Sequence, residues 1–77
     1  MQLNFATYQT AAAITPSDVN PQSYRAIYVG GAGNVAVETL GGNVVTFTAP
    51  PVGTVLPVEV KRVLSTGTTA TLLIGLA

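Results

Sequence analysis

The sequence contains no cysteine, no histidine and no tryptophan, and few of its residues carry charge. Without cysteine the chain forms no disulfide, and without cysteine or histidine it lacks the usual ligands of transition metals. A single domain of 77 residues buries only about 60% of its unfolded surface, and such domains usually gain stability from disulfides, metals or partner subunits. Partner subunits are the device that remains, so we expect an oligomer and no cofactor.

Charged residues make up 8% of the chain, against about 25% in ordinary soluble domains, and the formal net charge is zero. Three basic residues are too few for a phosphate-binding patch, so we expect no nucleic-acid partner. The apolar runs are far shorter than the roughly 20 residues of a membrane-spanning helix, so we expect no membrane association. Low charge is typical of a surface covered in an assembly, or of one kept soluble by Thr, Asn, Ser and Gln alone.

The two parts of the chain differ in composition. Residues 24–77 combine β-branched residues with glycine pairs, which predicts an all-β domain: a small antiparallel β-sandwich or barrel of about five strands. Polar residues and two prolines dominate residues 1–23, which we expect to form an extended N-terminal arm with a short strand at Leu3–Tyr8. The strands expected in the domain are Tyr24–Val29, Val35–Leu40, Asn43–Thr48, Thr54–Leu64 and Ala70–Leu76.

Alternation is clearest in Thr54–Leu64, where Pro57 indicates an edge or a bulge. The apolar set of that strand, interrupted by Arg62, is Leu56, Val58, Val60 and Leu64. The last strand, Ala70–Leu76, is apolar at nearly every position, so we expect it to be buried on both faces, against its own sheet and against a neighbour or a second sheet.

The stretch GGAGNVA (Gly30–Ala36) follows a strand and resembles a dinucleotide-binding loop. Such a loop must run into a helix whose N-terminal amides hold the pyrophosphate. Here it runs into alternating β-branched residues and then into Gly41-Gly42, which predicts a strand and a hairpin turn. We therefore interpret Gly30–Asn34 as a hairpin loop whose glycines adopt left-handed backbone angles.

Catalytic constellations are also missing, and we predict that the protein is not an enzyme. Lys61 and Ser65 would lie about 13 Å apart on a strand, too far for a Ser–Lys pair. Glu38 and Glu59 are better explained as partners of basic side chains than as a catalytic pair.

The aromatic residues form two groups, one expected in the core and one expected to contact another subunit. Phe47 is expected in the core because it lies on an alternating strand. Phe5 and Tyr8 lie in an arm too polar to form its own core, so they are candidate anchors into another subunit, the alternative being that they fold back on their own sheet. The candidate residues for contact with another subunit or a partner protein are Leu3, Phe5, Tyr8, Ile14, Tyr24 and Tyr28.

Several motifs resemble the head spike base proteins of bacterial gene transfer agents and related tailed phages. They are ITPSD (Ile14–Asp18), RAIYVGGAGNV (Arg25–Val35), the Gly41-Gly42 turn, PVGTVLPVEVKRVL (Pro51–Leu64) and TGTTAT (Thr66–Thr71). The resemblance covers most of the chain, while the first residues, MQLNFATYQTAAA, depart from the usual start of that family.

The resemblance implies a non-enzymatic virion protein, made in the host cytoplasm and placed on the outer surface of the capsid. It implies an oligomeric base, with a pentamer favoured and a trimer possible, that contacts the major capsid protein and anchors an outer spike or fibre. The resemblance also leaves open a cement or decoration protein at three-fold capsid positions. A further alternative is a glycan- or receptor-binding module that would use Tyr24, Tyr28, Asn34 and Asn43.

Overall fold

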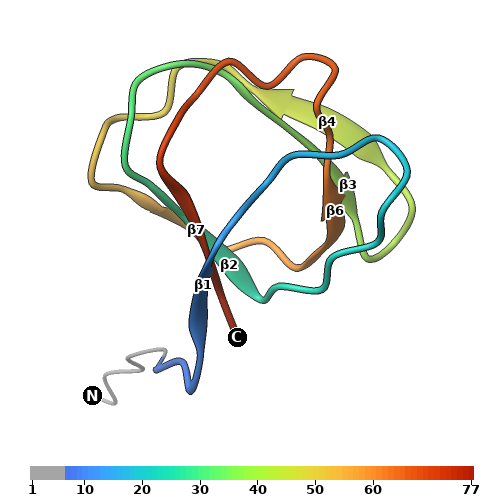
Figure 1. The fold of residues 1–77 in the computed structure, drawn as a ribbon, viewed down its shortest axis with the longest axis horizontal. Helices are drawn as coiled ribbons and strands as arrows, with labels where there is room; N and C mark the ends of the chain where they lie inside the picture. The colour runs from blue at the N-terminus through green and yellow to red at the C-terminus, as the bar shows by residue number, and fades with distance from the viewer. Residues whose placement is uncertain (1–6) are drawn as a thin grey trace, which may run out of the picture.

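A computed structural model describes residues 7–77 of the chain as two antiparallel β-sheets (Figure 1). The four-stranded sheet has the order β1 (Ala11–Ala13), β7 (Leu73–Leu76), β2 (Ala26–Val29), β5 (Val55–Leu56). The three-stranded sheet has the order β4 (Val44–Phe47), β3 (Val35–Thr39), β6 (Val60–Val63). No helix occurs in the described residues, so the all-β prediction is confirmed.

The core lies between the two sheets and consists of small branched side chains. Both sheets contribute residues that are almost completely buried, and loop residues close the ends of the core. The core residues are Ile14, Ile27, Val29, Val35, Val37, Val60, Val63, Ala70 and Leu73. Phe47, expected in the core, is only partly buried and packs against its margin.

The strand expected over Thr54–Leu64 is two strands in the structure. Pro57 has no N–H to donate to a ladder, so the chain leaves the four-stranded sheet after β5 and enters the other sheet as β6. This division and the additional strand β1 give seven short strands where about five were expected.

A bulge in β6 changes which side chains of that strand enter the core, compared with the apolar set predicted from the sequence. Val37 pairs with Val63 and Thr39 with Val60, so Lys61 is the extra residue between two buried valines. The strand therefore buries Val63, and Leu64 is only half-buried. The same extra residue brings Lys61 and Arg62 to the outer face together.

The loop after β2 is not a hairpin, as was expected, because β2 and β3 belong to different sheets. Of its three glycines only Gly33 has a positive φ, of 145°. Gly30 and Gly31 lie directly against the backbone of Thr71 and Leu72, where a Cβ would collide. These glycines therefore permit a close approach of two loops.

The Gly41-Gly42 turn is a β-hairpin, as expected. The Thr39 N–H donates to the Asn43 carbonyl at 2.8 Å, and the Gly42 N–H donates to the Thr39 carbonyl at 2.9 Å. Gly42 has a φ of 96°, which a residue with a side chain rarely adopts. This turn joins β3 to β4 and leaves β4 at the margin of its sheet.

The segment from Ile14 to Tyr24 runs along the outside of β6. Backbone N–H groups of Ser17, Gln22 and Tyr24 donate to carbonyls of β6 at 2.6–3.1 Å. The strand expected at Leu3–Tyr8 lies mostly outside the described residues, and Tyr8 itself is not in a strand. Pairing in this part of the chain occurs at Ala11–Ala13, which bind β7.

Candidate interaction surface

The described part of the chain, residues 7–77, contains no pocket and no group of three or more carboxylates that could hold a metal ion. Within the same residues no helix is long and apolar enough to span a membrane. The features to consider are therefore the outer faces of the two sheets.

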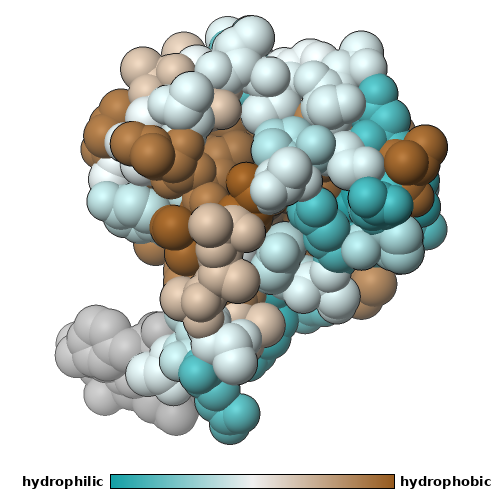
Figure 2. Space-filling view, in the orientation of Figure 1, coloured by the Kyte–Doolittle hydropathy of each residue, from teal (hydrophilic) through white to brown (hydrophobic). Residues whose placement is uncertain are grey.

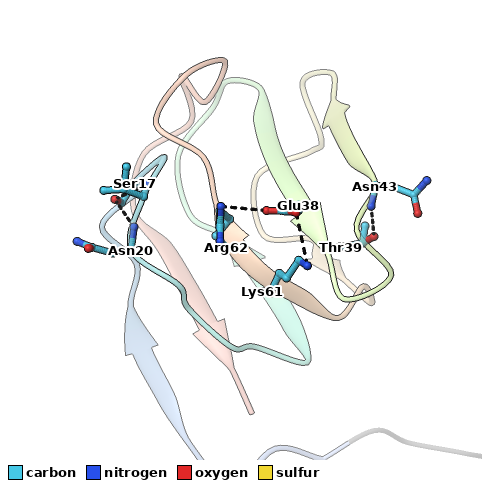
Figure 3. A network of polar contacts seen from close by, with 8 residues as sticks. Ser17, Asn20, Glu38, Thr39, Asn43, Lys61 and Arg62 are labelled. Atoms are coloured by element: carbon cyan, nitrogen blue, oxygen red, sulfur yellow. Dashed lines mark hydrogen bonds and ion pairs between the residues drawn. The ribbon is translucent and has the colours of Figure 1, made fainter.

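Charged side chains gather on the outer face of the three-stranded sheet (Figure 3). Glu38 on β3 forms ion pairs with two residues of β6: its Oε1 lies 3.2 Å from Arg62 Nη1 and its Oε2 lies 3.5 Å from Lys61 Nζ. These side chains are partly exposed, so each pair stabilises the fold by at most about 1 kcal/mol. The cluster joins the neighbouring strands β3 and β6.

A second polar contact ties the Ser17–Asn20 turn to the turn after β6. Ser17 Oγ accepts from the Asn20 N–H at 3.0 Å (Figure 3). The Asp18 carboxylate accepts from the Thr66 hydroxyl at 2.5 Å and from the Thr66 N–H at 3.0 Å. These hydrogen bonds favour the ionised form and lower the pKa of Asp18 below its usual value.

The outer face of the four-stranded sheet carries no charge. Tyr28 pairs with both Val55 and Ile74, and Ile74 pairs with Ala13, so these side chains share one face. Ile27 and Val29, which alternate with Tyr28, belong to the core, so the shared face points outward. The exposed or half-buried members of this charge-free face are Ala11, Ala13, Tyr28, Val55, Ile74 and Leu76.

Figure 2 shows brown and tan atoms over β7, β2 and β1, with teal atoms gathered on the opposite side. Two further exposed apolar residues flank this sheet, Val52 at 59% and Leu72 at 75% exposure. An uncharged face of this kind resembles the core of a protein–protein interface more than an ordinary protein surface.

The structure places two of the predicted contact residues inside the molecule. Ile14 is 9% exposed and belongs to the core. Tyr24 is half-buried, and its ring occupies the space where a side chain on Gly75 would lie.

The other candidates are distributed differently. Leu3 and Phe5 lie outside the described residues. Tyr8 is half-buried, and the Arg25 guanidinium lies 5.8 Å from the centre of its ring. Among the candidates within residues 7–77, Tyr28 alone lies on the charge-free face.

Most residues of the charge-free face were not predicted from the sequence, although one sequence feature indicated such a face. Ala70–Leu76 is apolar at successive positions, so an outward side chain is apolar as well as an inward one. In the structure Leu73 and Gly75 are buried, while Ile74 and Leu76 are half-buried on the outer side. Val55 gave no comparable signal, because the register of β5 depends on the break at Pro57.

The fold and its surfaces define a class: a small all-β protein of two packed sheets, one of which has a charge-free outer face. No protein-family model and no curated protein sequence matches the chain. Among solved structures it is similar to a chain in the capsid of a native gene transfer agent (GTA) particle computed with C5 symmetry. The TM-score is 0.83 at 36% sequence identity, covering 94% of this chain and 86% of that one.

The chain therefore belongs to the family of GTA- and phage-type capsid proteins represented by that structure. The resemblance read from the motifs is confirmed at this level. The narrower assignment to head spike base proteins stays a prediction.

Proposed function

We propose that the protein is a non-enzymatic structural component of a virion, located on the outer surface of the capsid. It acts there as an oligomeric base that contacts the major capsid protein, stabilises the shell and anchors a head spike or fibre. The observation that carries this proposal is the charge-free face, since contiguous exposed apolar surface of this kind commonly marks a protein–protein contact.

Two further facts support a role in an assembly. The related chain is part of the capsid of an assembled particle, and the motif resemblance favours a pentamer. Every fully buried side chain of large volume in the described residues is a valine or an isoleucine, so the core of one copy is small. Contacts between copies would add apolar burial at about 25 cal/mol per Å².

We propose that residues 1–23 form the arm of this protein and residues 24–77 its β domain. In this division the arm reaches the shell or a neighbouring copy, with Leu3, Phe5 and Tyr8 as its anchors. Ala11–Ala13 and residues 14–23 would then be the parts of the arm that are fixed to its own domain.

The test is a cryo-electron microscopy map of particles with and without this protein. We expect added density outside the shell at the five-fold vertices, with a further spike or fibre above it. Density at three-fold positions would instead identify a cement protein, and particles that are identical with and without the protein would overturn a structural role.

The mass of the protein in solution tests the proposed oligomeric state independently of the particle map. Light scattering after size-exclusion chromatography should report a mass several times that of the 7.8 kDa chain, with five copies favoured. A stable folded monomer at concentrations well above micromolar would contradict the oligomeric base.

A further inference from the structure

Each sheet has edges whose backbone groups need partners, and the chain covers them unequally. The outer edge of β6 is occupied by Ser17, Gln22 and Tyr24 of the same chain. β5 is only two residues long and ends at Pro57. Two longer edges remain, those of β1 and β4.

On β1 the hydrogen bonds to β7 alternate along the strand. Thr10 and Ala77 exchange bonds of 2.7 and 3.0 Å, and the Ile14 N–H donates to the Leu73 carbonyl at 2.9 Å. In an antiparallel ladder the residue midway, Ala12, also faces β7. The N–H and C=O groups of Ala11 and Ala13 therefore point away from the sheet, and no residue between 7 and 77 binds them.

On β4 the same alternation applies. Thr39 and Asn43 form a hydrogen-bonded pair at 2.8 Å, so Val45 and Phe47 also face β3. The N–H and C=O groups of Val44 and Thr46 point outward and have no partner among the described residues.

Apart from the shortness of β1, neither edge carries the features that usually prevent strand addition. Natural edge strands are protected by being very short or by lysine, proline, bulges or a covering segment. The strands Ala11–Ala13 and Val44–Phe47 have no charged residue, no proline and regular pairing on their inner side. All three residues of β1 are exposed, as are Val44 (64%) and Val45 (40%) on β4.

We propose that β1 of one copy adds to the open edge of β4 of a second copy, in an antiparallel pair. The register is Ala11 with Thr46, Ala12 with Val45 and Ala13 with Val44. This register joins the outward N–H and C=O groups of Ala11 and Ala13 to those of Thr46 and Val44. The inference rests on the oligomer of the proposed function and names its contact.

Side-chain direction agrees with this register. Ala12 pairs with Gly75 beside the core residue Ile27, and Val45 pairs with the core residue Val37, so both point to inner faces. Ala13 and Val44 alternate with them and point to outer faces. The pairing therefore joins the two sheets of neighbouring copies into one continuous surface, with small alanines opposite the larger side chains of β4.

The positions of the edges favour a ring over a two-fold dimer. β1 and β4 lie at opposite sides of the molecule (Figure 1). A contact between two different surfaces of the same protein is head-to-tail, and it closes into a ring when the rotation between copies permits. A pentamer requires a contact of this kind.

Disulfide trapping tests the register, because the chain has no cysteine of its own. Ala12 and Val45 would form a non-hydrogen-bonded pair with Cα atoms about 4.5 Å apart, within the range of a disulfide. The double variant Ala12→Cys/Val45→Cys should give, under mild oxidation, a ladder of covalent oligomers on a non-reducing gel. Mixing the two single variants should give covalent dimers only.

The controls separate other arrangements. Ala12→Cys/Val44→Cys has the same number of thiols, but Val44 points to the opposite face, so no ladder is expected. A dimer from Ala12→Cys alone would show β1–β1 pairing, and a dimer from Val45→Cys alone would show β4–β4 pairing. Either result, with no ladder from the double variant, would overturn the proposed contact.

A proline substitution gives a second readout. The Ala11 N–H points away from β7, so Ala11→Pro removes a bond to the next copy and none within the chain. For Ala11→Pro we expect a thermal midpoint within a few degrees of that of the parent and at least tenfold weaker self-association. Ala11→Val should match the parent in both its thermal midpoint and its self-association. Full association of Ala11→Pro would overturn the inference. A parent chain that is itself monomeric would overturn the proposed function as well.

Discussion

The phenol ring of Tyr24 shows how single positions determine this fold. The ring fills the space beside Gly75 on β7, the glycine that pairs with the core residue Ile27. Glycine is needed here because a Cβ would enter the tyrosine ring. The residue thus closes the core and sets the path of the chain between the N-terminal segment and β2.

Substitution of Gly75 tests this contact. Gly75→Ala should destabilise the chain by about 1–3 kcal/mol, because the added methyl forces the ring to move. Gly41→Ala is the matched control: its added Cβ would have 3.6 Å to the nearest side-chain atom, so a change within about 0.5 kcal/mol is expected. Chemical denaturation of both variants measures the difference, and equal effects would contradict the contact.

Asp18 makes stability depend on pH at the acid end. Its pKa is lowered in the folded chain by the bonds from Thr66, so its contribution is complete above the unfolded pKa and is lost as pH falls below about 3.8. Asp18→Asn should therefore lower the thermal midpoint at pH 7, and its difference from the parent should narrow as the pH falls below 3.8. A gap between Asp18→Asn and the parent that stays constant over this fall in pH would contradict the role of the ionised carboxylate.

At the scale of single elements, the bulge in β6 decides which side chains enter the core. Without it, strict alternation from Val60 would bury Arg62 and Leu64. With it, Val63 is completely buried and the charged side chains of Lys61 and Arg62 meet Glu38 outside. One extra residue therefore replaces a buried charge with an ion pair at the surface.

Truncating two neighbouring residues tests the bulge. Val63→Ala removes two buried methyl groups and should destabilise the chain by about 2 kcal/mol. Leu64→Ala removes more atoms from a half-buried position and should destabilise it by about 1 kcal/mol or less. The reverse order in urea denaturation would indicate regular alternation through β6.

The strands with clear alternation could be predicted from the sequence, and the features that break alternation could not. Val35–Thr39 and the Gly41-Gly42 turn follow from local preferences that tertiary structure did not override. The break at Pro57 was visible as a proline, but the sheet to which each half belongs depends on contacts distant in sequence. The prediction for the Gly30–Gly33 loop was wrong for the same reason. Glycine is needed there because the loop lies against Thr71 and Leu72, which are distant in sequence.

The charge-free face could be predicted from the sequence only as a property of the whole composition. Low charge predicted a covered surface, but the location of that surface required the register of β2, β5 and β7. Of the six predicted contact residues, Ile14 and Tyr24 turn inward because the segment Ile14–Tyr24 packs along β6. Spacing in the sequence could not show this.

For the molecule as a whole, the distribution of charge determines how association should respond to salt. The ion pairs involve Glu38, Lys61 and Arg62 on one sheet, while the proposed contact strands β1 and β4 carry no charge. The dissociation constant should change less than about threefold between 0.1 and 1 M sodium chloride, where the screening length falls from about 10 to 3 Å. Sedimentation equilibrium would measure it.

A steep loss of association with salt would contradict an uncharged contact. The charge-reversal variant Lys61→Glu is a useful comparison, because it alters the polar face alone. Its self-association should equal that of the parent, although its stability should fall slightly.

The pairing of β1 with β7 also sets the order of events during synthesis. Ala11 lies opposite Leu76, so the two strands that meet are translated far apart in time. Contacts between distant segments form slowly, because loop closure must precede them. A nascent chain therefore cannot present a finished β1 to a neighbour until β7 has emerged from the ribosome. Strand donation is in this way restricted to chains whose translation has reached the final strand.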